Sequence, residues 1–297
     1  MSYLIKHDNF ELIDIPKAIK ASPFFDGNFK NYKTLEHGIY KDTQNGFVIV
    51  STEVEKKHKN KQAVKLIKDS VISFFSKRTH KRPMAAVKEA ILYANRQLYL
   101  EGTQNKNLTG EKISCLVVLI REKQVYYAYT GTNNLFFKEF GEFKRITPGK
   151  SRTESDDLSE TSYINSSVLN PNLKITVCKQ PFIPDTDDYL FVCSDAYAER
   201  SDDYIKSVVD SDKNMQEMAI ELAKYALAEN NIKTRLTFLL LRFNLKGGRH
   251  TRSGSFEYLY GNFIGKIIAT IISPPVLITL AAIILIMLLF FVNQLSV

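Results

Sequence analysis

The sequence predicts an α+β domain, a β-sandwich layered as helix, sheet, sheet, helix, followed by one C-terminal transmembrane helix. Strand, two helices, many strands, helix and strand follow one another along the chain, an order typical of α+β domains. The strands are nearly continuous apolar runs, as in sheets that are covered on both faces. Residues 274–292 carry no charge, which predicts the membrane segment.

The first half of the domain contains one early strand and two helices. Residues 1–45 have scattered aromatic and turn residues and are expected to be irregular, and GFVIVS at 46–51 is expected to be a buried strand. Apolar residues then recur at helical spacing over 64–75 and again over 87–98. Pro83 precedes the second stripe and is suited to the first turn of a helix.

The second half is dominated by strands. A polar loop is expected at 149–162, and a helix is indicated by the apolar spacing over 215–225. The expected strands, in order, are 113–120, 124–131, a hairpin over 134–147, 172–178, 189–193 and a closing strand at 236–243.

The composition excludes several classes of protein. The net charge of +8 comes from 40 basic and 32 acidic residues spread along the chain, so no nucleic-acid partner is expected. All three cysteines lie in apolar runs, which predicts buried thiols in a reducing compartment. The five histidines are scattered, and no phosphate-binding loop, dinucleotide fingerprint or zinc spacing is present.

The C-terminal region predicts a single-pass tail anchor. Residues 274–292 as a helix would span about 28 Å, close to the hydrocarbon core of a bilayer. Positive charge lies just upstream at Lys246, Arg249, Arg252 and Lys266, which favours a cytoplasmic domain. The expected organisation is a domain at 1–245, a basic linker at 246–262 and an anchor at 263–293.

Four segments between about residues 40 and 243 stand out as motifs. They are AVKEAILYANRQLYLEG with ISCLVVLI, then QVYYAYTGTNNLFFKEFGEFKRITPGKS, then DDYLFVCSDAYAERSDDYI, and finally LTFLLLRF. Together they resemble PPM-type (protein phosphatase 2C-like) serine/threonine phosphatases of the bacterial type. Each segment matches a motif of that family, and the four stand in the family's order.

The resemblance implies a β-sandwich flanked by helices and a site for two or three magnesium or manganese ions. In the family, aspartates at strand ends hold the metals, which activate a water for attack on phosphorus. This sequence keeps one such ligand, Asp195. The other motif positions are degenerate: Thr52 for the bridging Asp, Glu53 for the next Gly, Thr132 in the Gly-Asp-Ser turn, Ala196 after Asp195, and Thr234 and Arg235 in the last turn.

Three interpretations remain open. The favoured one is a catalytically inactive pseudophosphatase with no catalytic residue, metal or cofactor, which binds a protein partner such as a phosphoprotein; Asp195 would then only bond backbone amides at a strand-to-helix turn. The second is a divergent serine/threonine phosphatase in which Glu53 and Asp195 hold manganese or magnesium. The third is a structural subunit of a membrane complex, whose anchor also contacts other spans.

Overall fold

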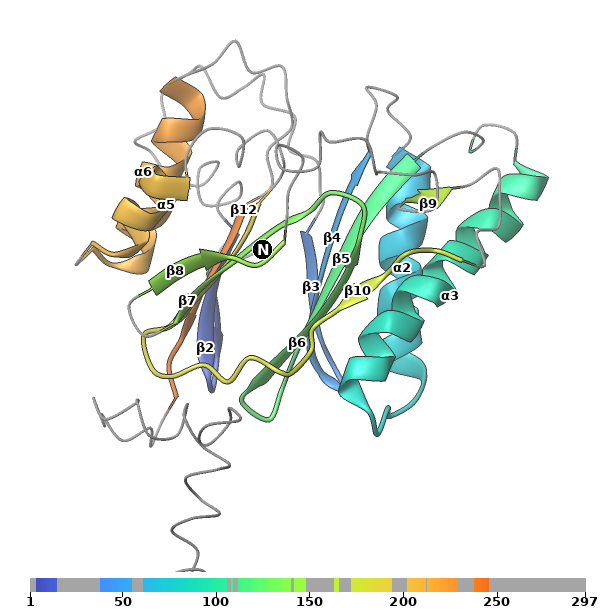
Figure 1. Ribbon diagram of the computed structural model, residues 1–297, viewed down its shortest axis with the longest axis horizontal. Coiled ribbons are helices and arrows are strands. Elements are labelled where there is room, and N and C mark those ends of the chain that lie inside the picture. Colours follow the sequence, from blue (N-terminus) through green and yellow to red (C-terminus); the bar gives the residue numbers. More distant parts are fainter. Residues whose placement is uncertain are drawn as a thin grey trace, which may run out of the picture. The chain divides into compact units, whose positions relative to one another are not determined.

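The computed structural model describes residues 4–14, 38–54, 61–105, 108, 112–139, 142–147, 163–165, 172–193, 202–211, 213–228 and 238–245. The chain divides into two compact units, Met1–Gly247 and Gly248–Val297, and every described residue belongs to the first. That unit contains two β-sheets with helices beside them (Figure 1).

The first sheet brings together strands from both ends of the domain. Its order is β1-β2-β12-β11-β7-β8, and all neighbours are antiparallel. The strands are β1 (Leu4–His7), β2 (Phe10–Asp14), β12 (Phe238–Phe243), β11 (Tyr189–Cys193), β7 (Asn134–Glu139) and β8 (Glu142–Arg145).

The second sheet has the order β10-β6-β5-β4-β3, with β9 also paired to β5. Its pairings are antiparallel as well. The strands are β10 (Thr176–Val177), β6 (Gln124–Thr130), β5 (Lys112–Arg121), β4 (Gly46–Val54), β3 (Gly38–Thr43) and β9 (Ile164–Asn165).

One core lies between the two sheets. On β5, Leu116, Val118 and Ile120 point into it and pack in a cluster with Leu190 and Leu241 of the first sheet. The intervening residues of β5 point the other way, because successive side chains of a strand alternate between its faces. The expected sandwich of two sheets is therefore confirmed.

A second core covers the outer face of the second sheet. Helices α2 (Lys61–Lys77) and α3 (Pro83–Gln104) pack there against Val48, Val50 and Val117 (Figure 1). Pro83 occupies the start of α3 as expected. Because β5 is buried on both faces, its sequence is apolar at nearly every position.

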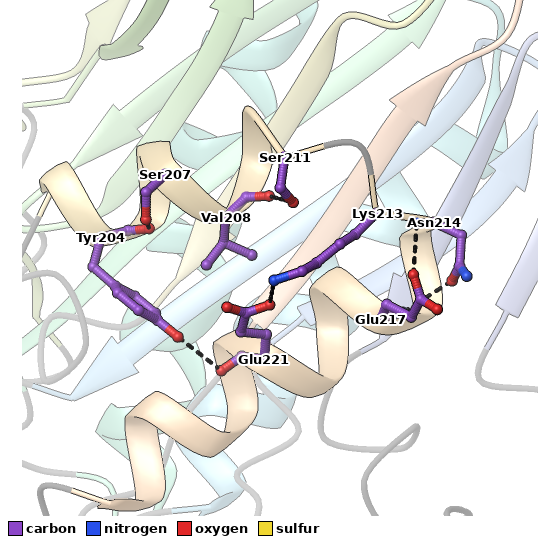
Figure 2. A network of polar contacts seen from close by, with 8 residues as sticks. All are labelled: Tyr204, Ser207, Val208, Ser211, Lys213, Asn214, Glu217 and Glu221. Carbon is purple, nitrogen blue, oxygen red and sulfur yellow. Dashed lines mark hydrogen bonds and ion pairs between the residues drawn. The ribbon is translucent and has the colours of Figure 1, made fainter.

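The helices α5 (Asp202–Val209) and α6 (Met215–Ala228) form a pair beside the first sheet. A capping box begins α6: Asn214 Oδ1 accepts hydrogen bonds from the amides of Gln216 and Glu217 at 3.0 Å, and the Glu217 carboxylate accepts from the Asn214 amide (Figure 2). Lys213 forms an ion pair with Glu221, whose carbonyl accepts a hydrogen bond from Tyr204 of α5.

Asn45 ties together the turns at one end of the second sheet. It lies in the β3–β4 turn and is 1% exposed. Its Nδ2 donates to the carbonyls of Phe75 (2.6 Å) and Arg78 (2.8 Å), and its Oδ1 accepts from the His80 amide. Arg121, at the end of β5, donates to the His80 carbonyl at 2.8 Å. The connection between α2 and α3 is thus fixed to both hairpins of the sheet.

The sequence-based expectation was wrong for part of the N-terminal region. Residues 4–14 form the hairpin β1–β2, with Asp8 and Asn9 in its turn, and β3 lies at residues 38–43. The strand expected at 172–178 contains only the two residues of β10, while the strand expected at 46–51 continues to Val54. The hairpin within 134–147 is confirmed as β7 and β8.

None of the described helices is long and apolar enough to cross a membrane. The proposed anchor at 263–293 lies outside the described residues, as does the linker at 246–262.

Candidate functional site

The metal-site positions of the resemblance fall at one end of the two sheets. In the second sheet, Thr52 of β4, Cys115 of β5 and Thr130 of β6 are paired side by side near that end. In the first sheet, Asn134 of β7 pairs with Cys193 of β11. Only residues 131–133 separate β6 from β7. These strand ends therefore belong to the same end of the sandwich, called the site end below.

Thr52 faces the helices rather than the other sheet. Its neighbours at alternate positions, Val48 and Val50, and its cross-strand partner Cys115 all belong to the core beneath α2 and α3. Thr52 is 0% exposed, and its hydroxyl oxygen has no hydrogen-bond partner among the described residues. The metal-ligand position that the resemblance gives to Thr52 thus lies on the helix side of β4.

Glu53 lies on the opposite face of β4. It shares that face with Phe47 and Ile49, which belong to the core between the sheets. Its cross-strand partner is Ser114, whose hydroxyl donates to the Glu53 backbone carbonyl at 3.2 Å. Glu53 is partly exposed at the end of the core. A carboxylate therefore stands at the rim of the space between the two sheets.

Gly131 begins the turn between β6 and β7 and is required there. Its φ is 72°, in the left-handed region that side chains disfavour. A Cβ at this position would lie 2.7 Å from the Cβ of Ser114 and 2.8 Å from Cδ1 of Tyr163. Packing and backbone conformation thus require glycine at this position, which the resemblance aligns with the family's Gly-Asp-Ser turn.

The rest of this turn is buried and neutral. Thr132 is 5% exposed and Asn133 is 4% exposed. Asn133 Nδ2 donates to the Thr130 carbonyl at 2.9 Å. The Thr147 hydroxyl donates to the Asn133 carbonyl and accepts from the Leu135 amide at 2.9 Å. The turn is held by its own hydrogen bonds, and Thr132 presents a hydroxyl where the family motif has a carboxylate.

The three cysteines are buried thiols, as predicted. Burial raises the pKa of the Cys115 thiol from 9.0 to about 12 and also raises the pKa of Cys178. Because a thiolate is the nucleophilic form, these two thiols are unreactive near neutral pH.

Four predicted site residues, Asp195, Ala196, Thr234 and Arg235, lie outside the described residues. Within the part of the chain that is described, no three His, Cys, Asp or Glu side chains are grouped so that they could hold a metal ion.

Sequence reasoning missed which residue of β4 faces the other sheet. Both faces of this strand are covered, so an apolar residue occupies nearly every position from Phe47 to Val50 and no alternation is visible. Pairing with β5 shows which face each residue of β4 occupies. Thr52 pairs with Cys115, which lies in the core beneath the helices, whereas Glu53 pairs with Ser114 on the opposite face.

No family model and no curated protein sequence matches this chain. Solved structures do match its fold. The catalytic domain of the serine/threonine protein phosphatase PstP, crystallised with two manganese ions, has a TM-score of 0.56 and 13% identity, covering 71% of this chain and 93% of that one. PstP of Mycobacterium tuberculosis is similar at a TM-score of 0.55 and 13% identity, with 71% and 94% covered. Stp1 of Staphylococcus aureus has a TM-score of 0.56 and 18% identity, with 82% and 97% covered.

Proposed function

We propose that this chain is a catalytically inactive PPM-type pseudophosphatase that binds a protein partner at a membrane. The observation that carries this proposal is the turn Gly131-Thr132-Asn133, which has a glycine at positive φ where the family motif also has glycine, while its buried side chains are neutral. A domain that has this fold but lacks the acidic metal ligands can still bind a protein partner, whereas metal-dependent hydrolysis of a phosphate ester requires those ligands.

Ligand chemistry supports the loss of activity. A pair of magnesium or manganese ions requires several hard, anionic oxygen ligands. Thr132 offers a hydroxyl, and Thr52 is turned toward the helices. The motif match places Arg235 at the edge of the same site, where its positive charge would repel a cation. Glu53 and Asp195 remain, fewer carboxylates than a metal pair requires.

The role left to such a domain is recognition. Suitable partners are a phosphoprotein that binds without being hydrolysed, or the subunits of a membrane complex for which the domain is a scaffold. The apolar segment 274–292 would hold the domain at the membrane, and the basic residues Lys246, Arg249 and Arg252 would keep it on the cytoplasmic side.

Activity measurements on the full chain in detergent test the proposal. We expect no hydrolysis of an aryl phosphate or a phosphopeptide above the buffer rate, with or without manganese. An Asp195→Ala variant, prepared in the same way, controls for a contaminating phosphatase. Manganese-dependent hydrolysis that disappears in Asp195→Ala would refute the inactive assignment.

The face on which Glu53 lies favours a second candidate, a divergent metal-dependent phosphatase. Its carboxylate stands on the side of β4 that faces the other sheet, where it could bind one ion together with Asp195. Calorimetric titration of the full chain with manganese separates the two candidates. Binding that is lost in both Glu53→Gln and Asp195→Asn would favour the phosphatase, whereas the pseudophosphatase predicts no binding by any of the three proteins.

Membrane attachment is tested separately by flotation. The full chain reconstituted with phospholipid vesicles should float with them and resist extraction at high salt. A chain lacking residues 264–297 should stay at the bottom of the gradient. Flotation of this truncated chain would remove the anchor from the proposal without affecting the pseudophosphatase assignment.

A further inference from the structure

The last strand of the domain, β12, finishes at the end of the sandwich opposite to the site end. Strand β12 ends at Phe243, whose ring centroid lies 6.3 Å from that of Phe182. Phe182 in turn exchanges backbone hydrogen bonds of 2.8 and 2.9 Å with Val125, at the start of β6. Residues 244–245 lie at this end, where the Asn244 amide donates to the Asn9 carbonyl and the Leu245 carbonyl accepts from Thr186. The β5–β6 turn lies at the same end of the sandwich.

The connection between α2 and α3 at this same end is strongly basic. Together with the last residue of α2, it contains Lys77, Arg78, Lys81 and Arg82, all exposed, and residues 77–82 include no acidic residue. Among the described residues, none of these four forms an ion pair, and the Lys77 ammonium lies 5.7 Å from the centre of the Tyr93 ring. The hydrogen bonds from Asn45 and Arg121 hold the backbone that carries them.

The charges nearby leave this patch positive. The β5–β6 turn adds the exposed Lys123, while Glu122 pairs with Arg121. Asp42 of β3 is the other exposed acid of the adjoining hairpin. On the first sheet, Asp187 is paired with Arg242. Asp8 and Asp185 are also exposed at this end, so its acidic residues are only partly neutralised. The α2–α3 connection itself contains no acidic residue, and the positive charge is therefore concentrated there.

An exposed apolar side chain lies at this same end of the sandwich, next to the start of β6. Ile183 is 63% exposed and, with Leu100, is one of two large apolar residues that the described part of the chain exposes. It directly follows Phe182, whose ring stacks on Phe137 with centroids 4.2 Å apart and whose backbone is bonded to Val125. The Ile183 side chain is therefore exposed to solvent next to a residue whose ring and backbone are both held in place. It lies close to Leu245, the last described residue of the domain.

We propose that this surface, made of residues 77–82, Lys123 and Ile183 and here called the basic end face, contacts the anionic lipid surface of the membrane that holds the C-terminal segment. Ile183 would enter the interfacial region while the lysines and arginines contact the acidic headgroups. The site end would then point away from the bilayer, toward a partner in the cytoplasm. The inference rests on the proposed membrane attachment.

The connecting chain makes a lipid partner more fitting than a protein one. Residues 246–262 extend at most about 60 Å even when fully stretched, so attachment confines the whole domain to the layer next to the lipid, and the positive charge favours the basic end face as the side that makes contact. Each basic residue near an anionic surface strengthens binding about fivefold. Because attachment makes the contact intramolecular, even a weak contact of this kind is populated.

A solvent-sensitive dye on Ile183→Cys tests this contact in the full chain reconstituted into vesicles. Cys115, Cys178 and Cys193 are buried and do not compete for the label. Leu100→Cys is the matched control, since Leu100 is the other exposed apolar residue and lies about 25 Å along α3 from Pro83, toward the site end. We expect blue-shifted emission from position 183, but not from position 100, in vesicles containing phosphatidylglycerol.

Charge and salt complete the test. The shift should disappear in pure phosphatidylcholine vesicles, at high salt, and after Lys77→Glu, Arg78→Glu, Lys81→Glu and Arg82→Glu are combined. The salt series on the unmutated loop keeps the test decisive if the fourfold variant misfolds. Chain that floats with the vesicles but gives no shift at position 183, or equal shifts at both positions, would overturn the basic end face alone. Failure to float would overturn the attachment and this inference with it.

Discussion

The two ends of the sandwich differ in what their polar groups do. At the site end, a buried turn is closed by neutral hydrogen bonds, and the Thr52 hydroxyl is buried without a hydrogen-bond partner among the described residues. At the opposite end, the Asn45 side chain satisfies three backbone groups, and four basic side chains remain in solvent.

This difference separates the requirements of the fold from those of the chemistry. The turn conformation requires Gly131 whether or not a metal binds. Asn45 is required because its side chain holds the connection between α2 and α3. The carboxylates of a metal site have no such structural role, so they can be lost while the sandwich persists. The following changes test that separation, beginning with the largest expected effect.

Thr52→Asp should destabilise the domain most. The new carboxylate would face the helices in a site that is 0% exposed, so an uncompensated charge would cost about 3–5 kcal/mol. The matched variant Thr52→Val removes the unpartnered hydroxyl and should stabilise by about 0.5–1 kcal/mol. Urea unfolding of the full chain in detergent measures both. If Thr52→Asp instead folds normally and gains manganese affinity, position 52 faces the site and its assignment to the helix side is wrong.

Asn45→Ala should be the next most damaging change, at the opposite end. Two carbonyls and one amide in a buried region would lose their partner, at a cost of about 3 kcal/mol in the free energy of unfolding. The neighbouring Gln44 is exposed, and Gln44→Ala is expected to change stability by less than about 0.5 kcal/mol. Equal effects of the two variants would show that Asn45 does not hold the α2–α3 connection.

Gly131→Ala should lower stability by about 2 kcal/mol, because alanine disfavours a positive φ and its Cβ meets Ser114 and Tyr163. Adding Ser114→Gly removes one of the two collisions and should restore part of the loss. A double-mutant cycle by urea unfolding measures this coupling. Simple additivity of the two changes would argue against the contact between Gly131 and Ser114.

Cys115 should make stability fall as the pH rises above 9. The folded thiol keeps its proton up to a pKa of about 12, against 9.0 for the ordinary thiol. Between these pH values the unfolded chain loses a proton that the folded chain retains. The contribution of Cys115 to the free energy of unfolding is therefore complete below pH 9 and declines above it. The slope is at most about 1.4 kcal/mol per pH unit. Unfolding curves between about pH 8 and 10 should show a shallower decline for Cys115→Ala than for Ser114→Ala.

The helices and central strands were predictable because burial marks them strongly. The stripe from Val87 to Leu98 lies against the second sheet as expected, and β5 and β11 are unbroken apolar runs. The N-terminal strands were missed since Lys6, His7 and Glu11 interrupt them with polar residues. In the same way, Lys41 and Asp42 interrupt the apolar pattern of the edge strand β3, which was therefore not predicted.

The candidate site was less predictable for the same physical reason. Continuous burial identifies β4 as a strand, but it also removes the alternation that would tell which face Thr52 and Glu53 occupy. Only pairing with β5 distinguishes them. The motif matches at Asp195, Ala196, Thr234 and Arg235 remain predictions.

The place of β12 has a consequence for the order of folding. This last strand lies between β2 and β11, and Leu239 pairs with Asp14, 225 positions earlier in the chain. Until β12 is synthesised, β2 and β11 both keep an unpaired edge that can join other chains. Contacts of such long sequence separation also form slowly. A nascent chain thus needs protection until nearly the whole domain has left the ribosome, and any premature stop codon before position 238 yields a polypeptide prone to aggregate.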